Sequence, residues 1–235
     1  MWLVKIVVLT GAGISAESGV PTFRDADGLW EGHSIEEVAT PEGFESQPKL
    51  VQEFYDARRE HLVGVQPNAA HIALAGLEEQ LPDDLLVVTQ NIDDLHERAG
   101  SRNVIHMHGE LNSAWCRACD RRTHWTRTLV DFPPCPGCGA TELRPDVVWF
   151  GEIPYQMDRI LAAVAEADLF VSVGTSGAVY PAAGFVQQAL RYGAKTLELN
   201  LDPSEGSVWF HESRLGPASV LVPSWVDDVL ASQHL

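Results

Sequence analysis

The chain has 235 residues, of which 45% are hydrophobic and 21% charged, which are the proportions of an ordinary soluble globular protein. Its formal net charge of −17 at pH 7 comes from 33 acidic and 16 basic residues. Because a protein that binds a phosphate backbone needs a basic surface, we expect no direct nucleic-acid partner. Glu166 and Asp168 interrupt the longest apolar candidate, residues 161–174. We therefore expect no membrane partner either.

The apolar residues 1–9 could be mistaken for a signal peptide. The segment carries Lys5 in its middle, lacks a small-residue cleavage site and continues directly into a glycine loop, so it predicts the first strand of the fold. All four cysteines lie in two paired motifs, which leaves none for a disulfide framework and predicts a cytoplasmic location. The length fits one large domain with a small insertion.

The predicted strand at residues 4–10 leads into a glycine loop, residues 11–16, with the sequence GAGISA. This sequence matches the G-x-G-x-x-(G/A) pattern of a dinucleotide-binding loop, in the required position between a strand and a helix. Glycine allows the backbone to close on a pyrophosphate, and free N–H groups at the helix start attract negative charge. The loop therefore predicts a dinucleotide site.

The segment after this loop departs from the pattern of an NAD-dependent dehydrogenase. Such an enzyme continues into a second strand, which carries a ribose-binding acid about 20 residues further on. Here residues 20–30 are rich in Pro, Gly and Asp, and they include Phe23, Arg24 and Trp30. Since long loops over nucleotide sites are often functional, we expect this loop to cover the ligand. A solvated surface loop is the alternative.

Two helices are predicted between this loop and the next strand. Within residues 47–63, Tyr55 lies on the same face as both Arg58 and Arg59, and spacing alone does not choose between them. An exposed Tyr/Arg pair is the structural alternative. The second helix, residues 68–80, carries His71, which we interpret as a core or capping histidine rather than a ligand.

Polar side chains follow the next apolar run, residues 85–88, which predicts a buried strand. The sequence TQNID occupies residues 89–93, and two histidines follow in HMHG, residues 106–109. Open α/β sheets collect ligands where their parallel strands end, and unpaired polar groups are costly to bury. We therefore predict a ligand site here. The alternative is that Asn91 or Asp93 caps a helix.

The cysteines form two C-x-x-C pairs that are separated by 15 positions, a spacing typical of a four-thiolate zinc site. Four thiolates fill a tetrahedron and leave no position for water, so the predicted zinc is structural. Residues 116–146 contain five arginines and four acidic residues. This excess of one positive charge is too small for a zinc finger that binds nucleic acid. A redox dithiol is the alternative. The predicted zinc ligands are Cys116, Cys119, Cys135 and Cys138.

Strands and helices alternate through the rest of the chain. We expect strands at residues 168–173, 194–199 and 218–222, with a helix at residues 182–192 and a short final helix. The first of these strands ends in a small polar loop, residues 174–177. This pattern predicts an α/β fold with a doubly wound, parallel, Rossmann-like sheet. The expected divisions are a discontinuous dinucleotide-binding domain (1–30, 81–112 and 146–235), a helical insertion (31–80) and a zinc-binding module (113–145).

With these pieces in place, the sequence resembles the sirtuins, which are NAD-dependent protein-lysine deacylases. The resemblance covers most of the chain, from residue 4 to about residue 226. It also extends to the branch that removes acidic acyl groups, because Tyr55 and Arg58 match that branch's Tyr-x-x-Arg pair, and Ala39 matches its small pocket residue. The blocks that match are GAGISAESGVPTFR (11–24), TQNIDDLHERAG (89–100), HMHGE (106–110), both cysteine pairs, RPDVVWFGE (144–152), GTSGAVYPAAG (174–184) and ELN (198–200).

The resemblance makes the discontinuous domain the NAD-binding domain and the helical insertion (31–80) the acyl-lysine pocket, and it assigns roles residue by residue. His108 would be the general base, although His106 lies two positions earlier and sequence alone does not separate them. Asn91 would also be catalytic and would hold the nicotinamide carboxamide together with Ile92 and Asp93. The remaining NAD-binding residues would be Gly11, Ala12, Gly13, Ser15, Glu17, Phe23, Arg24, Trp30, Gln90, Gly174, Thr175, Ser176, Asn200, Leu201, Asp202 and Ala218. The acyl-lysine substrate would contact Ala39, Tyr55, Arg58, Val148, Phe150, Gly151, Glu152 and Val179.

The family mechanism consumes NAD as a co-substrate. The acyl-lysine oxygen attacks C1′ of the nicotinamide ribose and expels nicotinamide, and the histidine then acts as general base on the ribose hydroxyls. The expected products are free lysine, nicotinamide and O-acyl-ADP-ribose, so the reaction is also an acyl transfer. The substrate backbone would add as a strand between residues 150–152 and 177–179. Removal of succinyl, malonyl and acetyl groups from lysines of proteins follows as an expectation.

Two other functions fit parts of the sequence. An NAD-dependent dehydrogenase would also use the glycine loop, and a noncatalytic zinc-ribbon module would use the cysteines. A dehydrogenase would need the second strand that this sequence lacks. A zinc-ribbon module would leave Asn91, Asp93 and His108 without a role. Mono-ADP-ribosyl transfer is a possible side reaction of sirtuin-like folds. We expect a monomer with one zinc ion per chain.

Overall fold

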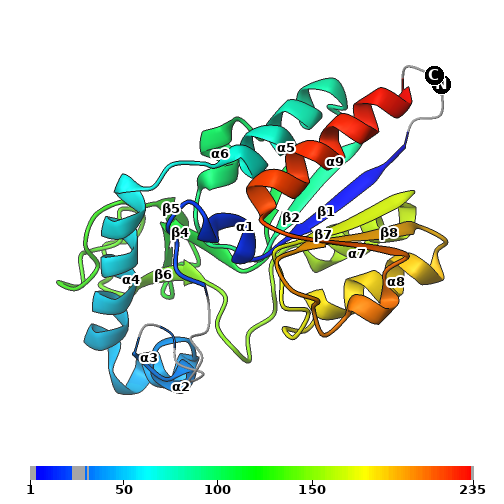
Figure 1. Ribbon diagram of the computed structural model, residues 1–235. Helices are drawn as coiled ribbons and strands as arrows, with labels where there is room; N and C mark the ends of the chain where they lie inside the picture. Colours follow the sequence, from blue (N-terminus) through cyan, green and yellow to red (C-terminus); the bar gives the residue numbers. More distant parts are fainter. Residues whose placement is uncertain (1–3, 23–29, 31, 234–235) are drawn as a thin grey trace.

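The computed structural model describes residues 4–22, 30 and 32–233 of the chain. Figure 1 shows a large α/β domain with a smaller lobe at one end of its sheet. Within the described residues, no helix is both long enough and apolar enough to cross a membrane.

The large domain is built on a six-stranded sheet in which every neighbouring pair of strands is parallel. Its spatial order is β3-β2-β1-β7-β8-β9. The chain builds the sheet outward from β1 in both directions, so the order reverses between β1 and β7, as in a Rossmann fold. This confirms the predicted fold class. The strands are β1 Ile6–Thr10, β2 Leu85–Thr89, β3 Val104–His106, β7 Leu169–Val173, β8 Lys195–Asn200 and β9 Glu212–Leu215.

Helices cover both faces of this sheet, which is why its central strands are continuous apolar runs. Helix α5 (Ala69–Gln80) packs with α9 (Ala218–Gln233) on one face, where side chains such as Leu74 and Trp225 meet β1 and β8. Helix α7 (Met157–Glu166) and α8 (Phe185–Arg191) cover the other face, and the short helix η1 (Ala182–Gly184) leads into α8.

The prediction of a strand at residues 218–222 is wrong. These residues form the first part of α9, and the buried positions Ala218, Val222, Trp225 and Val226 have a helical spacing. The last strand is instead β9, which is short, polar and largely exposed at the edge of the sheet. A short apolar run fits a strand or a buried helix equally well, and the pairing partner decides.

The smaller lobe combines three helices with a three-stranded antiparallel sheet of order β5-β4-β6. The helices are α2 (Ile35–Val38), α3 (Pro41–Ser46) and α4 (Pro48–Gly64), and the strands are β4 (Gly109–Cys116), β5 (Arg122–His124) and β6 (Leu143–Val147). Both parts share one apolar cluster, in which Phe44 and Tyr55 of the helices meet Trp149, just after β6. The remaining short helices are α1 (Gly13–Ala16), α6 (Leu95–Ala99) and η2 (Ser207–Trp209).

This arrangement shifts two of the expected boundaries. Helix α5 lies within the expected helical insertion, residues 31–80, yet it packs on the large sheet rather than in the lobe. The antiparallel sheet begins at Gly109 and ends at Val147, so it is wider than the expected zinc module at residues 113–145. Both shifts reflect packing partners that are distant in the sequence.

Candidate functional site

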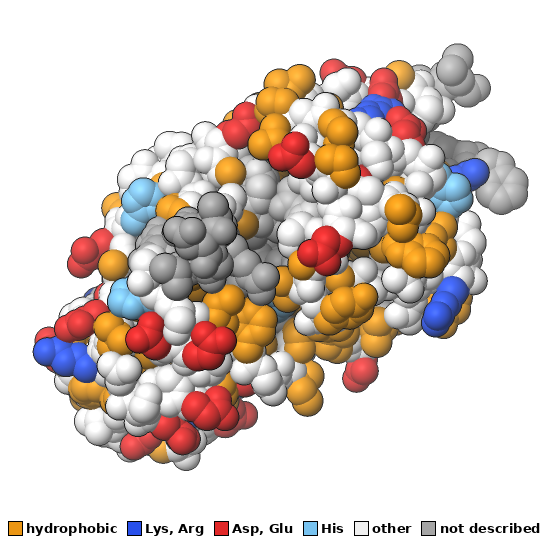
Figure 2. Space-filling view, turned by 60° about the horizontal axis from the view of Figure 1, so that its bottom comes forward, with side chains coloured by type: hydrophobic (Ala, Val, Ile, Leu, Met, Phe, Trp, Pro, Cys, Tyr) orange, Lys and Arg blue, Asp and Glu red, His pale blue; other side chains and the backbone are white. Residues whose placement is uncertain are grey.

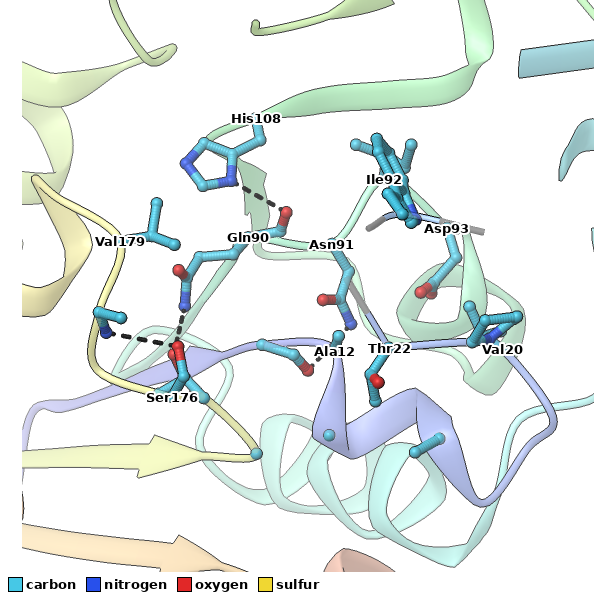
Figure 3. A pocket seen from close by; sticks show the side chains of 18 of the residues that line it. Ala12, Val20, Thr22, Gln90, Asn91, Ile92, Asp93, His108, Ser176 and Val179 are labelled. Carbon is cyan, nitrogen blue, oxygen red and sulfur yellow. Dashed lines mark hydrogen bonds between the residues drawn. The ribbon is translucent and has the colours of Figure 1, made fainter. Parts of the chain in front are cut away.

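A cavity of about 1080 Å³ lies between the large sheet and the lobe. The loops that follow β1, β2, β7 and β8 form one side of it, at the carboxyl ends of parallel strands, where open α/β sheets bind ligands. Residues of α4 and the segment after β6 form the other side. Figure 3 shows Asn91, Asp93 and His108 around this space, with Ala12 and Ser176 on two different loops. This volume can accommodate a large ligand.

Most of the residues predicted from the sequence meet in this one cavity. Phe23 and Arg24 lie outside the described residues, and Ser15 is fully buried behind the cavity wall. The predicted residues that line the cavity are Gly11, Ala12, Gly13, Glu17, Trp30, Ala39, Tyr55, Arg58, Gln90, Asn91, Ile92, Asp93, His108, Val148, Phe150, Gly151, Glu152, Gly174, Thr175, Ser176, Val179, Asn200, Leu201, Asp202 and Ala218.

The two glycine-containing loops at the polar end of the cavity pack directly on each other. The Gly13 N–H donates to the Gly174 carbonyl at 2.8 Å, and a Cβ added to Gly13 would lie 2.7 Å from the Gly174 Cα. Gln90 joins the loops after β2 and β7, because its Nε2 donates to Thr175 Oγ1 at 3.0 Å. The glycines therefore permit contact between the loops as well as close approach of a ligand.

Ser15 connects the side chains at the buried end of the cavity. Its hydroxyl donates to Asp93 Oδ2 at 3.0 Å and accepts from Asn91 Nδ2 at 3.1 Å. Behind it lies His71, whose Nε2 is 3.4 Å from Ser15 Oγ and whose Nδ1 accepts the Asn68 N–H. Burial lowers the pKa of His71 to about 4, so the ring is neutral at pH 7. The interpretation of His71 as a core and capping residue is confirmed.

Asp93 is 95% buried, and this burial raises the pKa of its carboxyl group above the ordinary value, against the opposing hydrogen bonds from Leu95 and Ser15. Its Oδ1 accepts the Leu95 N–H at 3.2 Å at the start of α6. The alternative interpretation, that Asp93 caps a helix, therefore holds for its Oδ1 atom. Its position on the cavity wall also makes it a hydrogen-bond acceptor for a ligand amide.

The two candidate histidines differ in what their ring nitrogens contact. His106 ends β3, and both of its nitrogens face acceptors, the Asn91 carbonyl at 3.0 Å and Glu97 Oε1 at 2.9 Å. Although burial opposes protonation, Glu97 raises the pKa of His106 above its ordinary value. A ring that donates from both nitrogens has no lone pair for a base.

His108 instead lines the cavity, in the turn that follows β3. Its Nδ1 is 3.1 Å from the Gln90 carbonyl, which can only accept, so Nδ1 carries the hydrogen and Nε2 keeps a lone pair (Figure 3). Burial lowers the pKa of His108, against the opposing effect of the Gln90 carbonyl. The geometry therefore separates the two histidines and supports His108 as the base.

Tyr55 and Arg58 lie together at the lobe end of the cavity. Tyr55 is fully buried, and the Arg58 guanidinium carbon lies 3.2 Å from the Phe54 ring centroid and 4.7 Å from that of Trp30. Arg59 is buried elsewhere, where it pairs with Asp56 and donates to the Leu111 carbonyl. The structure therefore gives Arg59 a structural role and leaves Arg58 beside Tyr55.

The segment after β6 is held from within the protein. The Phe150 N–H donates to the Ala39 carbonyl at 2.9 Å, and the Glu152 N–H donates to the Trp149 carbonyl at 3.0 Å. The Glu152 carboxylate pairs with the buried Arg144 at 2.7 Å. In this conformation, a substrate strand paired here would use other backbone groups, and its pairing with residues 150–152 stays a prediction.

The four cysteines gather at one end of the antiparallel sheet, with their ligand atoms all within 4.8 Å of one another. The Cys116–Cys138 and Cys119–Cys135 sulfur pairs are 3.7 Å and 3.8 Å apart. A tetrahedron with Zn–S bonds of about 2.3 Å has sulfurs about 3.8 Å apart, so the arrangement fits zinc. The Gly137 N–H donates to Cys135 Sγ, and this bond stabilises the thiolate form that a metal binds.

Several residues of the cavity wall were not predicted from the sequence, among them Trp149, His61 and Leu111. Trp149 lies within the block RPDVVWFGE (144–152) but has no chemical signal of its own. His61 is on the same helix as Tyr55, two turns later, and its Nε2 is 2.9 Å from the Gly19 carbonyl. Only the packing of α4, β4 and the segment after β6 around the cavity shows that these residues belong to the site.

Comparison with known proteins gives concordant results. The sequence model of the Sir2 family matches residues 11–181. An NAD-dependent protein deacylase from Pasteurella multocida is 56% identical over 230 residues, covering 97% of this chain and 98% of its own length. An NAD-dependent protein deacylase from Escherichia coli K12 is 56% identical over 229 residues, covering 96% of this chain and 82% of its own length.

Solved structures with the same fold contain the expected classes of ligand. A complex of a Sir2 homologue with NAD has a TM-score of 0.88 and 40% identity, and the match covers 97% of this chain and 90% of that chain. A mutant Sir2 homologue in complex with ADP-ribose has a TM-score of 0.90 and 40% identity, with 98% and 94% covered. A Sir2 protein bound to an acetylated peptide has a TM-score of 0.80 and 28% identity, with 98% and 93% covered.

Proposed function

The chain belongs to the Sir2 family, and on that premise we propose that it is an NAD-dependent protein-lysine deacylase. The observation that carries the proposal is the single cavity that joins the glycine loops, the polar group of Asn91 and Asp93, the base His108 and the Tyr55/Arg58 pair. A nucleotide and an acylated side chain can therefore approach each other in one cavity.

The residues of the cavity fit NAD by their chemistry. The loops at residues 11–13 and 174–176 offer phosphates a backbone N–H at Ala12 and the hydroxyls of Thr175 and Ser176, while the N–H groups of their glycines bond within the protein. Asn200 offers an amide beside them. The buried pair Asn91 and Asp93 offers an amide and an acceptor to a carboxamide. NAD supplies a ribose carbon with nicotinamide as its leaving group.

In this proposal His108 acts as the general base. Its Nε2 lone pair accepts a proton from a ribose hydroxyl, while its Nδ1–H stays on the Gln90 carbonyl and holds the ring in position. Asn91 is held on Ser15 and on the Gly11 carbonyl, at 3.2 Å, and orients the ligand. The expected products are the free lysine, nicotinamide and O-acyl-ADP-ribose.

Mass spectrometry of the products formed from an acyl-peptide and NAD tests the reaction. We expect nicotinamide and O-acyl-ADP-ribose in equal amounts with the deacylated peptide. Formation of NADH, or no change in either substrate, would overturn the proposal.

We further propose that the enzyme removes succinyl and malonyl groups as well as acetyl groups. Arg58 carries a planar guanidinium suited to a carboxylate, and the Tyr55 hydroxyl lies beside it in the same cavity. Since a hydrogen bond to a charged group is worth about 1.5–3 kcal/mol, Arg58→Met should lower desuccinylation by about 10- to 100-fold more than deacetylation. Matched succinyl- and acetyl-peptides measure this ratio.

Arg59→Met is not a suitable control here, because Arg59 is buried in an ion pair with Asp56. Arg127→Met serves instead, since Arg127 lies over the Trp125 ring in the zinc module. It should leave the succinyl/acetyl ratio within about twofold. Equal losses on both peptides in Arg58→Met would refute the acyl assignment while leaving the deacylase assignment standing.

A further inference from the structure

Trp149 donates a hydrogen bond to Tyr55 at the end of the cavity proposed to hold the acyl group. The direction of this bond determines how the Tyr55 hydroxyl can be used. The Trp149 indole Nε1 lies 3.0 Å from Tyr55 Oη, and both residues line the cavity. An indole N–H can only donate, so Tyr55 Oη is the acceptor in this bond. The hydroxyl hydrogen of Tyr55 is therefore left for a different partner.

Tyr55 keeps that hydrogen at neutral pH. Burial raises the pKa of the phenol well above its ordinary value, although the bond from Trp149 and the positive charge of Arg58 act in the opposite direction. Arg58, in the same cavity, has no acceptor in its side chain. With the Tyr55 oxygen already occupied by Trp149, the polar groups of this pair can both donate, which is the arrangement that a carboxylate requires.

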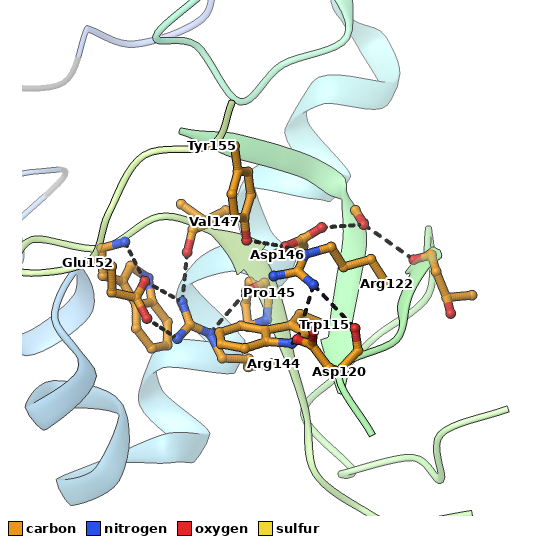
Figure 4. Close-up of polar contacts among 12 residues, drawn as sticks. Trp115, Asp120, Arg122, Arg144, Pro145, Asp146, Val147, Glu152 and Tyr155 are labelled. Atoms are coloured by element: carbon orange, nitrogen blue, oxygen red, sulfur yellow. Dashed lines mark hydrogen bonds and ion pairs between the residues drawn. The ribbon is translucent and has the colours of Figure 1, made fainter. Parts of the chain in front are cut away.

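Arg144 in β6 and Glu152 after it hold Trp149 in place. The Arg144 guanidinium carbon lies 3.3 Å from the Trp149 ring centroid and 4.9 Å from that of Trp115, next to the zinc ligand Cys116. Arg144 donates to both oxygens of Glu152, at 2.7 and 3.0 Å, and Glu152 accepts the Trp149 N–H at 2.8 Å (Figure 4).

We infer that Trp149 is a positioning residue for acyl selectivity: by donating to Tyr55 Oη, it turns the Tyr55 O–H toward the carboxylate of an acidic acyl group. The inference rests on the proposed deacylase function. Trp149 acts through Tyr55, so its contribution appears only on substrates that carry the carboxylate.

The test is a double-mutant cycle with Trp149→Phe and Tyr55→Phe, measured as kcat/KM on matched succinyl- and acetyl-peptides. Trp149→Phe keeps an aromatic ring and removes the donor. We expect it to lower the succinyl/acetyl ratio by about 5- to 10-fold, mainly through the KM for the succinyl-peptide, since a single hydrogen bond contributes about 1 kcal/mol. In the Tyr55→Phe background the same change should alter the ratio less than twofold, because the acceptor is already gone.

Trp125→Phe is the matched control. Trp125 is also buried and also donates its indole N–H, to the Thr128 carbonyl at 3.4 Å in the zinc module. It should leave the ratio within about twofold. Circular dichroism melting curves and zinc content of all variants identify a folding defect, which would lower activity on both peptides alike.

The outcomes separate this inference from the proposed function. A wild-type enzyme that uses both peptides, combined with equal losses on both in Trp149→Phe, no loss at all, or full additivity with Tyr55→Phe, would overturn the role of Trp149 alone. A wild-type enzyme that deacetylates but does not desuccinylate would overturn the acyl selectivity and this inference together. A protein that releases no nicotinamide from NAD with any acyl-peptide would overturn the deacylase function itself.

Discussion

At the scale of single residues, hydrogen-bond partners decide which side chains can do chemistry. His106 and His108 are two positions apart, yet one contacts a carboxylate and a carbonyl and the other keeps a nitrogen for the cavity. The same reasoning distinguishes Arg58, which lines the cavity, from Arg59, which pairs with the buried Asp56. Neighbouring residues of one type thus have different partners, and the chemical role is proposed for the one that faces the cavity.

The first prediction concerns the base. His108→Ala should lower the rate of deacylation by at least about 100-fold, because general-base catalysis contributes about 10²–10⁴. Binding of ADP-ribose, measured by calorimetry, should change less than about threefold, since the glycine loops lie elsewhere on the cavity wall. His106→Gln is the matched control and should reduce turnover less than about tenfold. A His108→Ala variant with unchanged turnover would contradict the assignment.

The pH profile is a second readout of the same histidine. His108 must be neutral to act as a base, and burial lowers its pKa below the ordinary 6.5. The neutral form is therefore lost only as the pH falls through that lowered value. The acid limb of kcat/KM should have its midpoint below pH 6.5, and a midpoint above pH 7 would disagree.

At the scale of elements, the loops after β1 and β7 form one unit, because Gly13 and Gly174 pack in direct contact. The Gly13 Cα has no room for a substituent, whereas Gly76 within α5 has no other heavy atom within 4 Å of an added Cβ. The same substitution at the two glycines should therefore have opposite consequences.

The second prediction follows from this contrast. Gly13→Ala should raise the KM for NAD by about tenfold or more and lower the free energy of unfolding by about 1–3 kcal/mol, because the added methyl group forces the two loops apart. Gly76→Ala should leave the KM unchanged and raise stability by up to about 1 kcal/mol, since alanine is the better helix former. Steady-state kinetics and denaturant titrations measure both effects. An unchanged KM in Gly13→Ala would show that the loops can separate without consequence.

The antiparallel sheet of the lobe is a second such element, joined at one end by the cysteine cluster and contacting α4 at its other face. The two cysteine pairs are separated by 15 positions, and apart from β5 the connection between them is irregular. A zinc ion bound there would cross-link the two segments and add to the stability of the small apolar cluster around Trp125 and Leu129.

The third prediction concerns this metal. Cys119→Ser should abolish the binding of one zinc ion per chain and lower the melting temperature by about 10 °C, corresponding to a loss of about 3–5 kcal/mol. Elemental analysis and calorimetry measure the two quantities. A chelator should shift the wild type in the same direction and should have no further effect on Cys119→Ser. Full zinc content in Cys119→Ser would show that the cluster is not a single four-thiolate site.

At the scale of the whole molecule, the net charge of −17 gives the surface a negative potential. On the face drawn in Figure 2, acidic side chains outnumber basic ones, and hydrophobic side chains gather around the middle of the face. Exposed Asp202 and Glu205 belong to the wall of the cavity itself. A peptide that approaches the cavity therefore meets a negative electrostatic potential.

The fourth prediction uses this field. A peptide with arginines on both sides of the acyl-lysine should lose about three- to tenfold in kcat/KM between about 50 and 300 mM salt, because screening weakens the attraction. A peptide with glutamates in the same positions should show the opposite trend. The kcat at saturation should be nearly constant for both. Parallel salt dependences for the two peptides would show that the overall charge does not steer the substrate.

Much of this molecule is determined locally. The central strands are apolar runs that can only be buried between layers, the glycine loops and the cysteine pairs have spacings that follow from the geometry of phosphate and metal binding, and these features predicted the fold class, the cavity and the zinc cluster. The sequence also predicted the classes of ligand, because few residue types suit the binding of a phosphate or of a zinc ion.

Other features depend on contacts between residues far apart in the sequence, and only the tertiary structure decided them. Residues 218–222 form a helix because α5 offers them a face, although the run itself suits a strand equally well. The contact with Glu97 distinguishes His106 from His108. The role proposed for Trp149 depends on Tyr55, which lies 94 positions away in the sequence. Periodicity and motif spacing report the properties of one segment, whereas a hydrogen bond or a packed face requires a partner whose position only the folded chain establishes.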